Sequence, residues 1–283
     1  QAGPARTRVI RQAITEATTQ LAAAGIDSAR VDAEYLAAHA AGVDRARVMF
    51  SEPDPEFYPR FRDLVARRAR RIPLQHLIGT AAFGPVEVRV GPGVFIPRPE
   101  TEALLEWAMT QPLPPSPLIV DLCTGSGALA LALAHTWPQA QVVAVEKSPE
   151  ALVYARRNCA GSAVEVLEAD VTVPSLLADR TGTVDLLVSN PPYIPEGAEL
   201  DPEVIDHDPA AALFGGPDGM SVIVPIIASA ARLLRPGGRL GIEHDDTTAD
   251  QVVAALERDG SFGDITARQD LAGRPRFVTA TRQ

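Results

Sequence analysis

The tetrapeptide Asn190-Pro191-Pro192-Tyr193 presents a polar and an aromatic side chain on a stiff piece of backbone. It directly follows the apolar, β-branched run 184–189, which predicts a buried strand. Two consecutive prolines cannot donate to a sheet and each fixes φ, so the chain leaves the strand in a rigid, extended course. Asn190 and Tyr193 are therefore expected at the carboxyl edge of a strand, where open α/β sheets bind ligands. Taken alone, the tetrapeptide is also compatible with a strand end that carries both residues by chance.

A glycine-rich turn, Asp121–Gly127, follows another predicted strand and leads directly into a helix. Its glycines let the backbone approach a ligand closely, and the first turn of the helix offers free N–H groups. The turn is not the dinucleotide-binding fingerprint, which needs glycine in place of Cys123, and it lacks the Gly-Lys-Ser/Thr of a P-loop. Cys123 is expected to be a small apolar residue and not a nucleophile, because no base is placed near it.

Two acidic residues follow the next two predicted strands. Glu146 lies 25 positions after Asp121, where a carboxylate can accept hydrogen bonds from both hydroxyls of a ribose. Asp170, followed by Val171, ends the third strand, where a carboxylate can accept from the exocyclic amine of adenine. Each acid alone is ambiguous, but together with the glycine turn they indicate a ligand that contains adenosine.

Neither a metal site nor a disulfide framework is expected. The two cysteines, Cys123 and Cys159, are too few for either. The run 243–246 holds one His and three acids, but consecutive residues cannot converge on one ion without help. We expect this run to border the ligand site as polar residues at the end of a strand.

Strand and helix patterns alternate from Leu118 onward, which predicts an α/β fold with a mostly parallel sheet and helices on both faces. The expected strands cover residues 118–123, 141–146, 163–169, 184–189 and 238–244, with 262–268 and 275–281 as a terminal antiparallel pair. The expected helices cover residues 127–136, 149–160, 220–234 and 248–258. The long loop 195–219 is expected to be a mobile flap.

The amino-terminal part has a different pattern. Residues 1–72 predict a small all-helical domain with segments over 5–24, 28–41, 44–50 and 55–71. Residues 73–95 predict a β-hairpin linker because valines alternate at 86, 88 and 90, and the sheet domain then spans 96–283. The arginines clustered at 67–71 are expected to be a solvated face, with a docking surface as the alternative.

Composition excludes several classes of protein. The chain has 283 residues with 46% hydrophobic content, enough for a substantial core, and no apolar run approaches the length of a membrane span. Its net charge of −10 divides into +3 for residues 1–75 and −13 for residues 76–283, which disfavours binding to duplex nucleic acid. The first eight residues lack the apolar core of a signal peptide, so a cytoplasmic protein is expected.

The glycine turn, the two acids and the tetrapeptide, in this order, resemble class I methyltransferases that use S-adenosylmethionine. Among these, the tetrapeptide resembles that of enzymes that methylate a planar nitrogen, either a base amine or a glutamine amide. Essentially the whole chain resembles the HemK/PrmC family of peptide chain release factor glutamine methyltransferases. The resemblance is carried by the blocks 73–79, 95–102, 121–127, 188–193, 212–216 and 218–220.

This resemblance implies a Rossmann-like, seven-stranded catalytic domain that transfers a methyl group from S-adenosylmethionine to N5 of the glutamine in the Gly-Gly-Gln motif of release factors. The implied cofactor-binding residues are Cys123, Thr124, Gly125, Ser126, Gly127, Glu146, Asp170, Val171 and Asn190. The implied substrate-binding residues are Phe95, Ile96, Arg98, Asn190, Pro191, Pro192 and Tyr193, with Asn190, Pro191 and Tyr193 as the catalytic ones. Cys123 and Glu146 depart from the Gly and Asp that are frequent in the family, but they keep a small residue and a carboxylate.

Three other functions stay open at this point: methylation of a nucleic acid base, methylation of a ribosomal-protein glutamine, and assembly without catalysis. The acidic catalytic part and the lack of a basic recognition module favour a protein substrate over a duplex. A monomer with release factors as partners, no membrane and no metal is the expected state.

Overall fold

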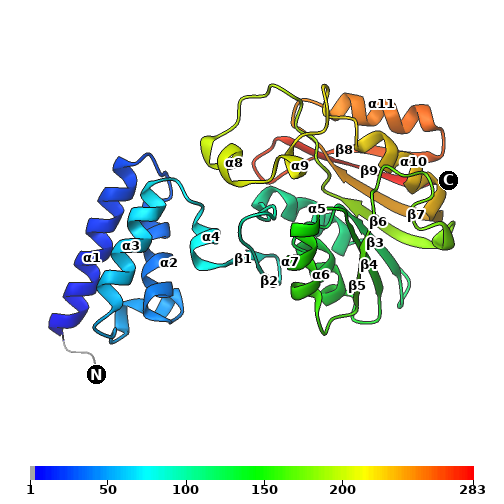
Figure 1. Cartoon of the computed structure of the whole chain (residues 1–283). Coiled ribbons are helices and arrows are strands. Elements are labelled where there is room, and N and C mark those ends of the chain that lie inside the picture. Colours follow the sequence, from blue (N-terminus) through cyan, green and yellow to red (C-terminus); the bar gives the residue numbers. More distant parts are fainter. Residues whose placement is uncertain (1–3) are drawn as a thin grey trace. The chain divides into compact units, whose positions relative to one another are not determined.

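The computed structural model describes residues 4–283, which form two compact units (Figure 1). One unit consists of residues up to Thr80 together with the separate segment Asp201–His207. The other consists of Ala81–Leu200 and Asp208–Gln283. We call them the helical unit and the sheet unit; the domain boundaries at 72/73 and 95/96 stay predictions.

The helical unit is built from amphipathic helices that bury one face each. Its amino-terminal part contains α1 (Pro4–Ala23), α2 (Ala29–Ala41), the 3₁₀ helix η1 (Arg45–Phe50), α3 (Phe57–Ala69) and α4 (Leu74–Ile78). Large apolar side chains fill its core, including Ile14, Leu21, Leu36, Phe57 and Phe61. Gly42 ends α2 with a φ of 67°, the left-handed conformation in which glycine is favoured. These helices agree with the sequence pattern to within about two residues.

The expected β-hairpin over 73–95 is only partly correct. Residues Leu74–Ile78 form the short helix α4, because Pro73 fits the position before a helix and Gly79 ends it with a φ of 80°. The hairpin itself is confined to β1 (Thr80–Phe83) and β2 (Val86–Arg89).

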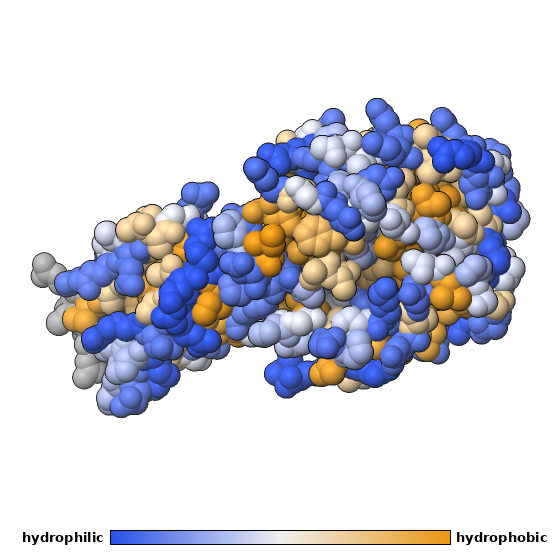
Figure 2. Space-filling view, turned by 45° about the horizontal axis from the view of Figure 1, so that its top comes forward, coloured by the Kyte–Doolittle hydropathy of each residue, from blue (hydrophilic) through white to orange (hydrophobic). Residues whose placement is uncertain are grey.

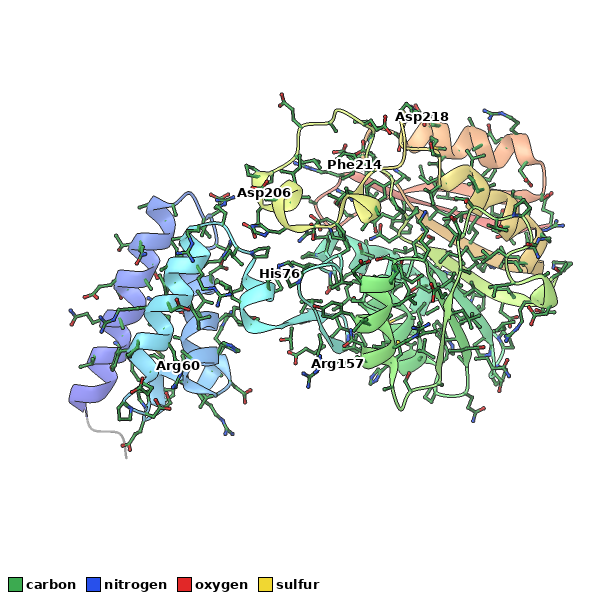
Figure 3. The ribbon with its side chains drawn as sticks, in the orientation of Figure 1. Arg60, His76, Arg157, Asp206, Phe214 and Asp218 are labelled. Carbon is green, nitrogen blue, oxygen red and sulfur yellow. The ribbon has the colours of Figure 1, made fainter. Side chains whose placement is uncertain are left out.

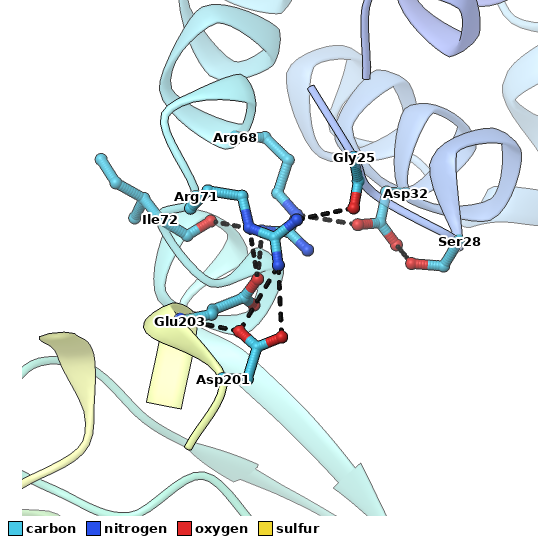
Figure 4. Close-up of polar contacts among 8 residues, drawn as sticks. All are labelled: Gly25, Ser28, Asp32, Arg68, Arg71, Ile72, Asp201 and Glu203. Atoms are coloured by element: carbon cyan, nitrogen blue, oxygen red, sulfur yellow. Dashed lines mark hydrogen bonds and ion pairs between the residues drawn. The ribbon is translucent and has the colours of Figure 1, made fainter. Parts of the chain in front are cut away.

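Arg68 is the centre of a buried ionic network within the helical unit (Figure 4). Its guanidinium is only 7% exposed, and it lies 2.8 Å from Asp32 of α2 and 3.0 Å from Glu203 of α8 (Pro202–His207). Arg71 contacts Asp201 at 3.4 Å. The arginine run is therefore not simply a solvated face, because Arg68 and Arg71 bind the segment 201–207 to the helices.

Replacing Arg68 with alanine should lower the free energy of unfolding of the helical unit by about 3–5 kcal/mol, because a buried Asp32 carboxylate is left unpaired. The matched control is Arg67→Ala. Arg67 forms an exposed pair with Asp63 at 3.8 Å, so its removal should cost less than about 1 kcal/mol. Hydrogen exchange of the α2 and α3 amides measures both effects. Equal protection in the two variants would show that the buried network does not stabilise the unit.

The sheet unit contains a seven-stranded sheet with the strand order β5-β4-β3-β6-β7-β9-β8 (Figure 1). Its strands are β3 (Leu118–Leu122), β4 (Gln141–Glu146), β5 (Val164–Glu168), β6 (Val184–Ser189), β7 (Leu234–Glu243), β8 (Phe262–Gln269) and β9 (Pro275–Arg282). β3 to β7 are parallel, and β9 runs antiparallel to both β7 and β8. The expected mostly parallel sheet with a terminal antiparallel pair is confirmed.

Helices cover both faces of this sheet. They are α5 (Glu102–Met109), α6 (Ala128–Thr136), α7 (Pro149–Cys159), α10 (Ile223–Leu233) and α11 (Ala249–Asp259). The apolar residues of β6 alternate between two cores: Leu186 and Val188 pack with α5 and α6, while Val184 and Leu187 pack with α10 and α11. A strand that is buried on both faces explains the continuous apolar run at 184–189.

Apolar side chains reach the surface of the sheet unit as several patches among hydrophilic ones on the face drawn in Figure 2. None of the described helices is both long and apolar enough to cross a membrane.

The chain order reverses at β3 and β6, which are direct neighbours in the sheet. From β3 the chain continues outward through β4 and β5, and from β6 it continues in the opposite direction through β7. Such a switch point leaves a crevice at the carboxyl ends of the two strands. The hydroxyl of Ser189 bridges them by donating to the carbonyl of Leu122 at 2.6 Å.

Candidate active site

A cavity of about 290 Å³ lies in the sheet unit and is lined by residues that follow the carboxyl ends of the parallel strands. It brings together the expected site residues Phe95, Cys123, Thr124, Gly125, Ser126, Glu146, Asp170, Val171, Asn190, Pro191, Pro192 and Tyr193. Segments that are up to about 100 residues apart in sequence thus meet at the edge that open α/β sheets use for ligands. The ligand-binding roles of these residues stay predictions.

Three expected site residues do not line this cavity. Ile96 is 1% exposed and belongs to the apolar core beside α5. Arg98 forms an ion pair with Asp208, and its guanidinium lies 5.0 Å from the ring centre of Phe95. Gly127 begins α6 with a φ of 86°, and a Cβ there would lie 2.9 Å from the sulfur of Cys159. Gly127 therefore serves helix packing, whereas Arg98 supports the position of Phe95.

Glu146 ties the glycine turn to the end of β4. One carboxylate oxygen accepts from the backbone N–H of Gly125 at 2.9 Å. The other accepts from the N–H groups of Lys147 and Ser148, at 2.8 and 2.9 Å. The carboxylate is thus held by three backbone donors and keeps one further lone pair for a hydroxyl of a ligand. This arrangement leaves room for one ribose hydroxyl and not for the two that were expected; the role in ribose binding stays a prediction.

The turn itself is strained at Cys123, which adopts a φ of 64°. This left-handed conformation favours glycine, so a cysteine there costs about 1 kcal/mol. Burial raises the pKa of the Cys123 thiol well above its ordinary value, which agrees with an unreactive packing residue. Beside it, the Thr124 hydroxyl donates to Asp121 at 2.6 Å, while burial raises the pKa of Asp121 to about 7.

Asp170, which also lines the cavity, remains ionised. The hydroxyl and the N–H of Thr172 both donate to its Oδ1, and these bonds lower its pKa. Lys147, the one lysine of the chain, lies 3.5 Å from the other oxygen, Oδ2. A carboxylate in this state can accept a hydrogen bond from an amine.

The segment after α9 (Ala210–Leu213) holds the tetrapeptide in place. The carbonyl of Leu213 accepts from the N–H groups of Tyr193 and Ile194, and Ile194 forms a bridge with Phe214. Gly215 packs so closely that a Cβ would lie 2.6 Å from the carbonyl oxygen of Pro192. The expected loop over 195–219 is therefore not a simple flap: it contains α8 and α9, and the part around Phe214 and Asp218 (Figure 3) belongs to the sheet unit.

Replacing Gly215 with alanine should lower the catalytic rate by about tenfold or more, because the new methyl group displaces the backbone that carries the tetrapeptide. The matched control is Gly263→Ala, in β8, where φ is not positive and a Cβ meets the flexible side chain of Gln283. Methyl-transfer rates and thermal melting of both variants separate a local effect from loss of folding. An active Gly215→Ala protein with normal stability would rule out the close packing as a requirement.

A cluster of buried polar side chains forms hydrogen bonds with the tetrapeptide. The hydroxyl of Tyr193 donates to Glu243 Oε1 at 2.8 Å, and Glu243 is 1% exposed. The Asn190 side-chain N–H₂ donates to the Thr101 hydroxyl at 3.3 Å. Tyr193 is thus fixed through its hydroxyl, and stacking of its ring on a substrate stays a prediction.

Thr101 was not expected as a functional residue, and Glu243 was expected only to border the ligand site as part of the run 243–246, none of which lines the cavity. The sequence marks both only as polar residues at the start of a helix and the end of a strand. Their shared feature, a buried position beside Asn190 and Tyr193, arises from the tertiary fold. No group of three or more His, Cys, Asp or Glu residues within the described chain could hold a metal ion, and this includes the run 243–246.

Comparisons with known proteins agree with this architecture. A PrmC N-terminal domain model matches residues 12–79, and a methyltransferase small domain model matches residues 87–207. A solved methyltransferase from Pyrococcus furiosus shares the fold, with a TM-score of 0.52 and 17% identity over 76% of this chain and 98% of that one.

Curated relatives are much more similar. The release factor glutamine methyltransferase of Mycolicibacterium smegmatis is 68% identical over 96% of this chain and 98% of its own length. That of Mycobacterium tuberculosis is 59% identical over 96% of this chain and 91% of its own length.

The sheet order and the cavity at its switch point define a class I S-adenosylmethionine-dependent methyltransferase. The curated relatives narrow the assignment from this class to one family, because they match this chain over nearly its full length and over nearly their own. The chain belongs to the release factor glutamine methyltransferase family.

Proposed function

We propose that this protein transfers a methyl group from S-adenosylmethionine to the side-chain amide nitrogen, N5, of the glutamine in the Gly-Gly-Gln motif of peptide chain release factors. The observation that carries the proposal is one cavity lined by the glycine turn, the Glu146 and Asp170 carboxylates, and the tetrapeptide at 190–193. Family membership supplies the substrate class.

The residues of the cavity fit S-adenosylmethionine. The lone pair left on Glu146 suits a ribose hydroxyl, and Asp170 suits the adenine amine. Val171 and Leu129 provide apolar lining beside them. When bound, this cofactor supplies an electrophilic methyl group.

The amide nitrogen of glutamine is a poor nucleophile because its lone pair is delocalised into the carbonyl group. The protein must therefore orient this nitrogen and accept its hydrogens. The side-chain oxygen of Asn190 and the backbone carbonyl of Pro191 can both accept from one NH₂ group. Catalysis then rests on positioning and on electrostatic stabilisation.

We further propose that the protein acts as a cytoplasmic monomer that does not bind duplex nucleic acid. The charge of −13 over residues 76–283 supports only the statement about nucleic acid, because a phosphate backbone requires a positive surface. The runner-up function is methylation of a base amine, which uses the same type of tetrapeptide.

The test is methyl transfer from labelled S-adenosylmethionine to a release factor with either Gln or Ala in its Gly-Gly-Gln motif, with a DNA duplex and RNA as parallel substrates. The proposal predicts label on the Gln protein alone. Label that persists on the Ala protein, or appears on nucleic acid in its place, would overturn it.

A further inference from the structure

Glu243 is a buried carboxylate that no step above uses. It is the last residue of β7 and is 1% exposed. Its Oε1 accepts from Tyr193, whereas Oε2 makes no hydrogen bond of ordinary geometry within the described chain. Burial raises the pKa of Glu243, and the hydroxyls of Thr101 and Tyr193 oppose this rise by stabilising the ionised form. A buried acid with spare acceptor capacity is costly, so its presence at this position calls for a role.

Thr101 connects Glu243 to the substrate side of the cavity. It is 4% exposed, and its oxygen accepts from the Asn190 N–H₂ group at 3.3 Å. A hydroxyl has one hydrogen to donate, and the nearby ionised Glu243 can only accept. Asn190 donates to Thr101, and Tyr193 donates to Glu243. The Thr101 hydroxyl keeps its own hydrogen, which is available to the nearby ionised Glu243.

We propose that Thr101 and Glu243 are positioning residues that fix which end of the Asn190 amide faces the substrate. With its nitrogen held by Thr101, Asn190 keeps its Oδ1 as the acceptor for the substrate NH₂ group. The reversed amide would present a second NH₂ group to the substrate and could not accept its hydrogens. The role assigned to Oδ1 rests on the proposed function, but the orientation itself does not.

The protonation state of Glu243 decides in which direction the hydrogen bonds between Glu243, Thr101 and Asn190 run. Once protonated, the carboxyl group can donate to Thr101, whose hydrogen then finds its acceptor in the Asn190 Oδ1 of the reversed amide. The groups that act on Glu243 are Tyr193, Arg276 of β9 and Glu100 of the 3₁₀ helix η2 (Pro99–Thr101), with His244 next in sequence. Arg276 is also paired with Asp270 at 3.1 Å.

Burial raises the pKa of Glu243 to about 7, against the opposing effects of Thr101, Tyr193 and Arg276. The ionised form is the competent one, so the rate should rise with pH through this pKa. Burial lowers the pKa of the neighbouring His244.

The first experiment compares Thr101→Val, Thr101→Ser and the control Thr279→Val, a threonine of β9 that is 3% exposed. Thr101→Val should lower kcat by about 100-fold with little change in cofactor affinity, because Asn190 loses its anchor. Thr101→Ser should restore most of the rate, and Thr279→Val should behave like the wild type. Equal rates for Thr101→Val and the wild type would overturn the proposal.

The second experiment replaces Glu243 with glutamine, which resembles the protonated acid. The variant should have a low kcat that no longer rises with pH near neutrality, whereas the wild type shows the rise. If kcat of Glu243→Gln depended on pH in the same way as kcat of the wild type, Glu243 would not control the orientation of Asn190.

A third readout does not need catalysis. In protein labelled with ¹⁵N-asparagine, the side-chain NH₂ signals of Asn190 should shift with pH near neutrality in the wild type and stay constant in Glu243→Gln. Identical titrations would exclude the coupling. If the wild type itself transfers no methyl group to glutamine, the proposed function fails, while these NMR signals still decide the orientation of Asn190.

Discussion

Replacing Asn190 with alanine is expected to lower kcat for methyl transfer by at least about 100-fold, while the affinity for S-adenosylmethionine changes by less than about threefold. Asn190 lines the cavity from the end of β6, and the proposed function assigns it to the substrate amide. Its loss removes an acceptor for the NH₂ group at the reacting nitrogen, but it leaves Glu146 and Asp170 in place.

Single-turnover rates with a release factor, together with calorimetric titration of the cofactor, measure both quantities. The matched control is Gln139→Ala, whose exposed amide accepts from the Ser116 hydroxyl at 3.4 Å, and it should leave both quantities unchanged. A loss of cofactor affinity in Asn190→Ala as large as its loss of rate would show that Asn190 belongs to the cofactor side of the site.

Replacing Glu146 with alanine should have the opposite signature, with cofactor binding weakened by roughly 100-fold or more. Three backbone N–H groups lose their acceptor, and each hydrogen bond to a charged group contributes about 1.5–3 kcal/mol. The glycine turn then keeps only backbone contacts with β4, such as that from Thr124 N–H to the Val145 carbonyl, and the proposed ribose contact is lost.

The matched control is Glu168→Ala. Glu168 is paired with Glu146 in the register of β4 and β5, but its side chain is 59% exposed and does not line the cavity. Calorimetry should find unchanged cofactor affinity in this control. Similar affinities for Glu146→Ala and the wild type would contradict the ribose assignment.

Much of the fold follows from local sequence. The run 184–189 is apolar without interruption because β6 is buried on both faces, and this pattern marks a central parallel strand. Helix starts and stops follow from residues such as Pro149, which occupies the first turn of α7, and Gly42. The strand ends then place the glycine turn, Glu146 and Asp170 at one edge of the sheet.

Other features could not be read from the sequence because they depend on distant partners. Arg68 looked solvated within its arginine run, but its partners Asp32 and Glu203 lie 36 positions before it and 135 positions after it. Residues 213–219 carry few polar or charged side chains, and their role comes from backbone contacts with the tetrapeptide. Neither set of contacts produces a periodic pattern or a fixed spacing in the sequence.

The positioning of Asn190 by Thr101 and Glu243 is a third feature that could not be read from the sequence. Thr101 and Glu243 are separated by 142 positions, and each alone is a common residue at the end of an element. The fold buries them together, and burial changes their chemistry by raising the pKa of Glu243 to about 7. The orientation of the Asn190 amide is thus determined by the tertiary structure.

The most direct test of the central claim is mass spectrometry of the Gly-Gly-Gln peptide from a release factor incubated with the wild-type protein and S-adenosylmethionine. The proposed function predicts that the peptide gains the mass of one methyl group, that fragmentation assigns it to the glutamine side chain, and that the Asn190→Ala protein adds none. A methyl group found on any other residue, or an unmodified peptide beside methylated nucleic acid, would contradict the account.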